Sequence, residues 1–211
     1  DVLGMPLVGH VVSATLSLEP QNTVVVVGHG KEQVTDYLAK NFAKATTVTQ
    51  EKQLGTGHAV QQALPQLDAA APTLVLYGDV PLTRLATLQR LIEASRQQGG
   101  SLAVLTVMLD DPSGYGRILR NDKQQVKAIV EEKDASPEQR NIQEIYSGIM
   151  AAPTRLLRGW LSRLDNANAQ AEFYLTDVVK FAVADGCEVN THVIEEAWQV
   201  EGVNTPIQLA E

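Results

Sequence analysis

The chain has 211 residues, 44% of them hydrophobic and 20% charged, which is enough to bury the core of one domain spanning residues 1–211. Its formal net charge of −8 argues against nucleic acid as a partner, because phosphate neutralisation needs clustered Lys and Arg, yet it leaves metal-bound nucleotides open. A lone Cys, no run of 18 apolar residues and no signal-like N-terminus predict a reducing, cytoplasmic setting without membrane insertion.

The first half of the chain predicts strands that alternate with helices. Pro6 starts an apolar helical stripe that ends near Leu16, and the β-branched run after it predicts a buried strand. The expected elements, in order, are a helix from Pro6, a strand over 23–27, a helix over 31–42, a strand over 45–50, a helix over 60–64 and a strand over 73–77. Short connections between alternating elements favour parallel strands joined by helical crossovers.

The second half adds an antiparallel insert. Thr83 and Thr154 are expected to cap two amphipathic helices. The remaining expected elements are a strand over 101–109, a hairpin of 116–120 with 126–131, a helix through Leu175 and a strand over 188–194. The predicted fold class is therefore α/β, with a mixed, mostly parallel sheet and helices on both faces.

Asp79 follows the most apolar predicted strand, in the sequence Tyr77-Gly78-Asp79. Ligands of such sheets bind beyond the carboxyl ends of the strands, so this carboxylate stands where a metal-bound phosphate is expected. Carboxylate oxygens are the hard ligands that Mg²⁺ prefers. The spacing alone leaves a second interpretation equally open, in which Asp79 only begins the turn before Pro81.

A second polar segment, QEKQLGTGH at 50–58, also follows a strand and opens a helix. The primary amide of Gln50 carries both a donor and an acceptor, which suits the edge of a pyrimidine base, and glycine lets the backbone approach such a base closely. Taken alone, the segment is also typical of an ordinary strand-to-helix loop with Thr56 as the N-cap.

These two segments and four later ones resemble a known family in the same order. The later segments are GYGRI at 114–118, IVEEKDA at 129–135, NAQAEFYLTD at 168–177 and EGVN at 201–204. The ordered set resembles the N-terminal domain of bacterial bifunctional N-acetylglucosamine-1-phosphate uridylyltransferase/glucosamine-1-phosphate acetyltransferases, through nearly the whole chain.

The resemblance implies a Rossmann-like nucleotide-diphospho-sugar transferase fold and Mg²⁺ as the cofactor. In the implied reaction, N-acetylglucosamine 1-phosphate attacks the α-phosphate of UTP and yields UDP-N-acetylglucosamine and pyrophosphate. By position, Asp79 and Asn204 match the family's metal-binding pair. The implied substrate-binding positions are Gln50, Gly55 and Thr56 for uracil, Tyr77 and Gly78 beside it, and Gly116, Glu131, Tyr146, Glu172, Tyr174, Thr176 and Asn204 towards the sugar and its phosphate.

Three features depart from the family pattern. The family begins with an apolar strand, a glycine-rich phosphate loop and a Pro-Lys-Val-Leu stretch, and this chain starts just beyond them, so the domain is expected to lack that strand and loop. Tyr146 stands where the family has an asparagine that contacts the sugar. Ala171 replaces a glycine before Glu172, which either tightens the loop or is tolerated if the φ angle there is negative.

Other functions stay open beside uridylyl transfer to this sugar. One is nucleotidyl transfer to another sugar 1-phosphate, and another is a domain that binds a nucleotide sugar without turnover. His29, in a glycine turn, is interpreted as structural, and without the resemblance Glu131 would be only a solvated hairpin residue. The family's parent proteins continue into a second, acetyltransferase domain and form homotrimers through it.

Overall fold

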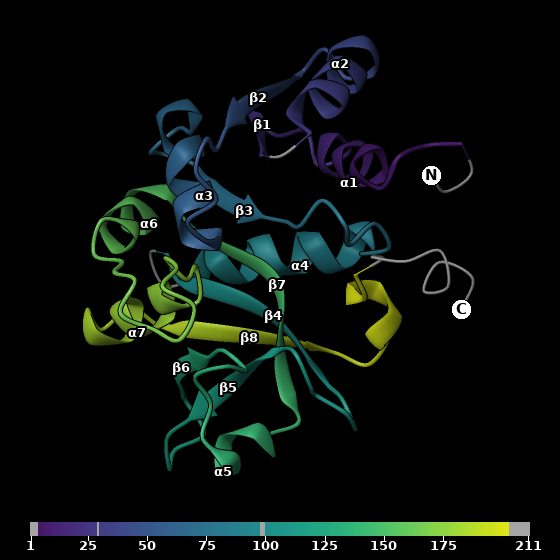
Figure 1. Ribbon diagram of the computed structural model, residues 1–211. Coiled ribbons are helices and arrows are strands. Elements are labelled where there is room, and N and C mark those ends of the chain that lie inside the picture. The colour runs from purple at the N-terminus through teal and green to yellow at the C-terminus, as the bar shows by residue number, and fades with distance from the viewer. Residues whose placement is uncertain (1–3, 29, 98–99, 203–211) are drawn as a thin grey trace.

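The computed structural model describes residues 4–28, 30–97 and 100–202, which form an α/β fold (Figure 1). Its main sheet has six strands. In spatial order, these are β6 (Val126–Val130), β5 (Gly116–Arg120), β7 (Glu144–Pro153), β4 (Leu102–Met108) and β8 (Val189–Ile194), and β3 (Pro72–Val75) pairs with β7 beside this path. A separate sheet joins β1 (Thr23–Val27) to β2 (Ala45–Thr49) in parallel.

The α/β class and the mixed sheet are confirmed, but fewer of the strand pairs are parallel than expected. In the described part of the chain, β1 pairs with β2 and β4 with β8 in parallel, whereas β7 runs antiparallel to β3, β4 and β5. The sequence did not predict β7. Eight of its ten residues are buried, in the pattern iBBBBBBBBi, so it lacks the apolar–polar alternation that reveals a half-exposed strand.

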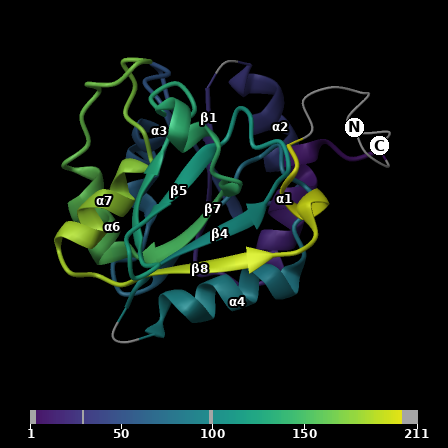
Figure 2. The same cartoon turned by 90° about the horizontal axis from the view of Figure 1, so that it is seen from below.

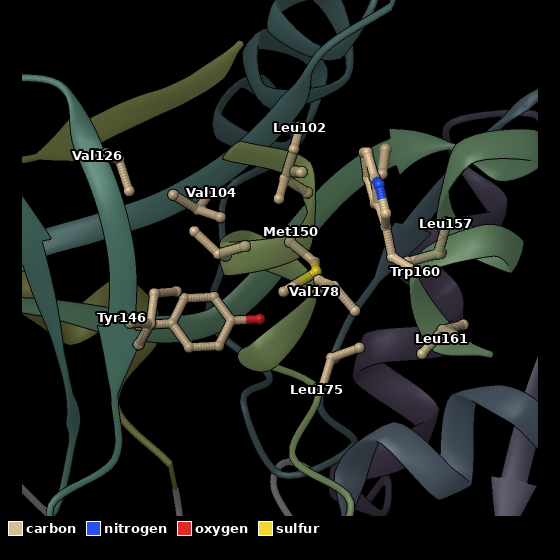
Figure 3. Close-up of a cluster of buried hydrophobic side chains, with 14 of the residues drawn as sticks. Leu102, Val104, Val126, Tyr146, Met150, Leu157, Trp160, Leu161, Leu175 and Val178 are labelled. Carbon is tan, nitrogen blue, oxygen red and sulfur yellow. The ribbon is translucent and has the colours of Figure 1, made fainter. Parts of the chain in front are cut away.

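Helices cover both faces of the main sheet, as the sequence predicted. In Figure 2, α4 (Leu85–Ser95) runs along one face, where Leu88 and Leu91 pack with Leu105 and Ile149. The opposite face carries α6 (Thr154–Leu161) and α7 (Asp177–Ala184), together with α3 (Thr56–Ala63). Figure 3 shows the core on that side, in which Trp160 is 2% exposed, as expected of a core residue at helical spacing. The remaining helices are α1 (Leu7–Leu16), α2 (Lys31–Asn41), α5 (Pro137–Arg140), η1 (Leu64–Gln66) and η3 (Ala197–Val200).

The two predicted threonine caps are wrong, because tertiary partners take the hydroxyls. Thr83 donates to the carbonyl of Gln199 at 2.8 Å, and the N-cap of α4 is Arg84, without a capping side chain. Thr154 is the first residue of α6 and donates to the carbonyl of Ala71 at 2.6 Å. Both hydroxyls therefore fasten the start of a helix to a distant segment instead of closing its first turn.

The two-stranded sheet and β3 lie on opposite sides of a cavity of about 1070 Å³. Residues of β1 and β3 line it together with residues of α1 and α3. In the described residues, no helix is long and apolar enough to cross a membrane.

Candidate active site

The carboxyl end of β3 presents Tyr77 and Asp79 at the edge of the sheet. Tyr77 is largely buried, and burial, followed by the charge of Glu131, raises its pKa to about 12. A hydrogen bond with Thr56 acts against this rise, whereas the charge of Asp79 adds to it. The Tyr77 phenol therefore stays protonated at neutral pH and can act as a hydrogen-bond donor.

Two predicted segments that are distant in sequence lie side by side here. The amide of Phe173 donates to the carbonyl of Leu54, and the amide of Gly57 donates to the carbonyl of Phe173, each at 2.8 Å. The amide of Leu175 donates to Oγ1 of Thr56 at 3.1 Å. Thr56 is thus the first residue of α3 rather than its N-cap, and its hydroxyl joins the proposed uracil segment to the proposed sugar segment.

Gly55 is the N-cap of α3 and has a φ of +108°, a conformation that residues with a side chain rarely adopt. A Cβ at this position would lie 2.7 Å from the carbonyl oxygen of Phe173. Only glycine therefore permits the close approach of residues 54–57 to residues 173–175.

Gln50 is held from two directions. Its Nε2 donates to the carbonyl of Gly55 at 3.1 Å and lies 2.8 Å from Nδ1 of His58. The His58 ring in turn lies beside Phe173, with centroids 6.3 Å apart. These contacts fix the amide group through its nitrogen and leave its carbonyl oxygen as a free acceptor among the described residues. No sequence pattern pointed to a role for His58, because its contact with Gln50 depends on how the loop folds back.

Glu131 lies just beyond β6 and meets the segment before α7. Oγ1 of Thr176 donates to Oε1 of Glu131 at 2.8 Å. Burial raises the pKa of Glu131, the hydrogen bond from Thr176 opposes the rise, and the charges of Asp134, Asp177 and Glu172 add to it. The interpretation of Glu131 as a solvated hairpin residue is therefore wrong.

Gly116 is buried and packs closely beside this carboxylate, since an added Cβ would lie 3.0 Å from Cγ2 of Ile129. A Cβ at Gly116 would lie 3.5 Å from Oε2 of Glu131, the oxygen that does not bind Thr176. This oxygen forms no hydrogen bond with Thr176 and keeps its capacity to accept a hydrogen bond from a hydroxyl.

The loop before Tyr174 is fastened to the β6 side of the site. The Tyr174 hydroxyl donates to Oδ2 of Asp134 at 3.0 Å, and the amide of Ala169 donates to Oδ1 of the same residue at 2.9 Å. Asn168 bonds the backbone of Glu172 in both directions. Ala171 has a φ of +53°, so the idea that it is tolerated through a negative φ is wrong, and the residue sits in a strained conformation.

Tyr146 is 5% exposed and lies on β7, opposite Gly116 of β5. Its hydroxyl has no hydrogen-bond partner among the described residues. Burial, and then the proximity of Tyr77 and Glu131, raises the pKa of this phenol well above its usual value. Figure 3 shows the ring directed into the core, towards Met150 and Leu175.

The predicted metal-binding pair is Asp79 and Asn204. Asn204 lies outside the described residues, as does His29. Tyr115, which the sequence did not single out, has its pKa raised by burial and then by the charges of Glu201 and Asp79. The carboxylate of Glu201, near the end of the described chain, is therefore close enough to Tyr115 to raise the pKa of its phenol. Among the described residues, no group of three His, Cys, Asp or Glu side chains forms a metal cage.

The geometry thus gathers most of the predicted residues around the carboxyl end of β3. Residues 1–155 match the model of the MobA-like NTP transferase domain. The chain belongs to this family. Membership makes it a nucleotidyltransferase domain and accounts for a polar site beyond the strand ends of an α/β sheet.

Two individual relatives are similar to nearly the whole of this MobA-like domain chain. The chain is 55% identical over 208 residues to the bifunctional protein GlmU of Paraburkholderia phymatum and 54% identical over 210 residues to that of Paracidovorax citrulli. These alignments cover 99% of this chain but only 45% and 44% of the relatives, so the chain spans about half their length.

Among solved structures, a UDP-glucose pyrophosphorylase complexed with UDP-glucose superposes with a TM-score of 0.74. The match covers 92% of this chain and 81% of that protein, at 16% sequence identity. This likeness confirms the nucleotide-sugar transferase fold.

Proposed function

We propose that this domain transfers a uridylyl group from UTP to N-acetylglucosamine 1-phosphate. A phosphate oxygen of the sugar phosphate forms a bond to the α-phosphorus of UTP, the bond from that phosphorus to the bridging oxygen breaks, and pyrophosphate leaves. The observation that carries the proposal is the joining of residues 54–57 to residues 173–175 beside Tyr77. The similarity to two GlmU proteins supports this choice of substrates.

The nucleotide half of the site consists of the backbone around Gly55, the Gln50 amide and the Tyr77 phenol. Gln50 is oriented by His58 and by the Gly55 carbonyl, so its free oxygen can accept a hydrogen bond from the N–H of a uracil ring. The exposed Gly78 leaves the backbone open beside Tyr77. These groups bind and orient the base rather than react with it.

The sugar half consists of Glu131, Thr176, Tyr174 and Glu172, with Gly116 and Tyr146 on the neighbouring strands. Oε2 of Glu131 is the acceptor proposed for a sugar hydroxyl, and Thr176 holds the carboxylate in place. Such positioning is the main contribution that a protein makes to phosphoryl-type transfer, because the reacting groups belong to the substrates.

We infer that Asp79 and Asn204 hold Mg²⁺. The Asp79 carboxylate is partly exposed and has no hydrogen bond or ion pair with any described residue, so it is available to a hard cation. When bound, magnesium would screen the repulsion between the two anionic substrates. The charges of Asp79 and Glu201 both raise the pKa of Tyr115, which supports a position of Glu201 on the same side of the site as Asp79.

A measurement of turnover distinguishes the proposed transferase from a domain that only binds a nucleotide sugar. The chain, with any sequence that flanks it in its gene, is expected to release pyrophosphate from UTP only when Mg²⁺ and N-acetylglucosamine 1-phosphate are both present. Calorimetry should show UDP-N-acetylglucosamine binding by the same protein. Binding without pyrophosphate release would select the non-catalytic function, and an equal rate without magnesium would reject the role of the metal.

We infer from the family resemblance that a longer protein containing this domain works in the cytoplasm and assembles as a homotrimer through a second domain. Sedimentation of the chain alone and of the longer protein tests this assignment. Trimers of the chain alone would reject it.

A further inference from the structure

Both hydrogens of the Gln50 side-chain amide have a partner within the protein. Its Nε2 donates to the carbonyl of Gly55 at 3.1 Å and lies 2.8 Å from Nδ1 of His58. The backbone amide of Gln50 donates to the carbonyl of Val27 at 2.8 Å, so the residue is held at its backbone as well as at its side chain. A backbone carbonyl can only accept, so the Gln50 nitrogen must face Gly55 and the Gln50 oxygen must face away from it.

The contact with Gln50 determines which nitrogen of the His58 ring accepts a hydrogen bond. An amide nitrogen only donates, so Nδ1 must be unprotonated for this contact to be a hydrogen bond. Nε2 of the same ring lies 3.2 Å from Nε2 of Gln62, but a neutral ring has a single acceptor nitrogen, so only one of the two contacts can be such a bond. The Gln50 contact is the shorter one, and Gln62 also donates to the carbonyl of His58. Nδ1 is therefore the acceptor, and Nε2 carries the proton.

The surroundings of the His58 ring hold it in this position. His58 is the third residue of α3, and its ring lies beside that of Phe173, with centroids 6.3 Å apart and an angle of 33° between the planes. The backbone of Phe173 is itself bonded to Leu54 and Gly57, each at 2.8 Å. The helix on one side and the segment around Phe173 on the other therefore limit the rotation that would turn Nδ1 away from Gln50.

We propose that His58 is a positioning residue through which Gln50 selects uracil over cytosine. The inference rests on the proposed function, in which the Gln50 oxygen contacts the base. With both amide hydrogens engaged, this oxygen can only accept. Uracil offers it the N–H of its ring, whereas cytosine has an unprotonated nitrogen at the same place, and two facing acceptors repel each other. His58 sets this preference without touching the base.

The Kd values for UTP and CTP, measured by calorimetry on the chain with any sequence that flanks it in its gene, test the inference. The unaltered protein should bind UTP at least about 100-fold more tightly than CTP. His58→Phe keeps a ring beside Phe173 but removes the acceptor, so it should lower this ratio at least about fivefold. His58→Asn can place Oδ1 where Nδ1 lies and should keep most of the ratio. A merely structural role of His58 would weaken both nucleotides by the same factor and leave the ratio unchanged.

Gln62→Ala is the matched control. It removes only the competing contact with the His58 ring and should leave the ratio of the two Kd values unchanged. Nitrogen NMR of the His58 ring in the unaltered protein shows which ring nitrogen is protonated, and it decides the question even if His58→Phe does not fold.

Four results would overturn the inference: a proton on Nδ1, equal binding of UTP and CTP by the unaltered protein, an unchanged ratio in His58→Phe, or an equal fall of the ratio in Gln62→Ala. Failure of the proposed function has a different signature. In that case the protein would bind UTP without releasing pyrophosphate, and the ratio of the two Kd values, which does not depend on turnover, would still respond to His58→Phe.

Discussion

Thr176 donates a hydrogen bond of 2.8 Å to Glu131, across a separation of 45 residues in the chain. The bond joins the segment that opens α7 to the end of β6, and it accompanies a carboxylate whose pKa is raised by burial. Glu131 is therefore held in position at a cost in stability when it is ionised.

This cost gives a pH-dependent prediction for Glu131→Gln. A carboxyl group whose folded-state pKa is raised stabilises the fold at pH values below its unfolded pKa of about 4.5, and this contribution is lost as the pH rises through the folded-state value. Glu131→Gln should therefore raise Tm at pH 7 relative to the parent, and the difference should shrink towards pH 4. Thermal unfolding from pH 4 to 8 measures it. A variant less stable than the parent at pH 7 would contradict the assigned burial cost.

The same Glu131→Gln variant should bind UDP-N-acetylglucosamine at least about tenfold more weakly, because a charged acceptor forms a stronger hydrogen bond than an amide. Calorimetry at pH 7 measures this. Unchanged affinity would remove Glu131 from the sugar site while leaving its effect on stability intact.

Asp79→Ala should reduce magnesium-dependent pyrophosphate release by about a hundredfold or more and change the free energy of unfolding by no more than about 0.5 kcal/mol, since a partly exposed carboxylate contributes little packing. Asp122→Ala, in the exposed turn after β5, is the matched control and should affect neither quantity. Unfolding of Asp79→Ala would instead support a structural role in the turn before Pro81.

Gly55→Ala should destabilise the protein and abolish nucleotide binding, because the added Cβ meets the Phe173 carbonyl at 2.7 Å in a conformation that alanine disfavours. Gly159→Ala in α6 is the control. It has open space around the new Cβ and should stabilise by about 0.5–1 kcal/mol as a helical Gly-to-Ala change. Chemical denaturation and UTP titration of both variants measure the contrast, and equal UTP binding by the two would refute it.

Ala171→Gly should stabilise the protein by about 1 kcal/mol, which corresponds to a rise in Tm of about 2–4 °C, because it relieves a φ of +53°. Ala169→Gly, two residues earlier in the same loop, lacks this benefit and should not raise Tm. A loss of stability in Ala171→Gly would show that the strain is compensated by contacts of the methyl group.

Tyr146→Phe should leave the protein equally stable or make it more stable by up to about 1–3 kcal/mol, since it removes a buried hydroxyl that has no partner among the described residues. Because the hydroxyl is enclosed in the core, the same variant should leave UDP-N-acetylglucosamine binding unchanged, and weaker binding would instead assign the hydroxyl to the sugar site. Competition among sugar 1-phosphates checks specificity in the parent. A preference for glucose 1-phosphate would reject the acetamido sugar as the substrate.

Local sequence patterns predicted much of the fold, but not β7 or the contacts between segments distant in the chain. The apolar stripe of α4 identified that helix because it has one regular buried face, and the unbroken β-branched run TVVVV identified the strand β1. β7 escaped because it is buried on both faces, and the threonine caps failed because Thr83 and Thr154 bond to segments more than 80 residues away. Such contacts depend on tertiary packing, which no local window contains.

For the site, residue spacing alone did not decide whether Asp79 and Gln50 bind a ligand. The ordered resemblance supplied the full set of candidate site residues. The structure brings Thr56, Tyr77, Glu131 and Thr176 together, whereas the pairing of Asp79 with Asn204 stays a prediction. His58 and Tyr115 were missed, because their roles arise from neighbours across loops. An expected lack of the family's first strand and phosphate loop likewise stays a prediction.

The backbone bonds between residues 54–57 and residues 173–175 have a thermodynamic consequence. A ligand that restricts the motion of one of these two segments also restricts the other. The free energies of binding at the nucleotide half and the sugar half are therefore not independent. Linkage requires that the factor by which a pyrimidine nucleotide changes the affinity for a hexose phosphate equals the factor by which the hexose phosphate changes the affinity for the nucleotide.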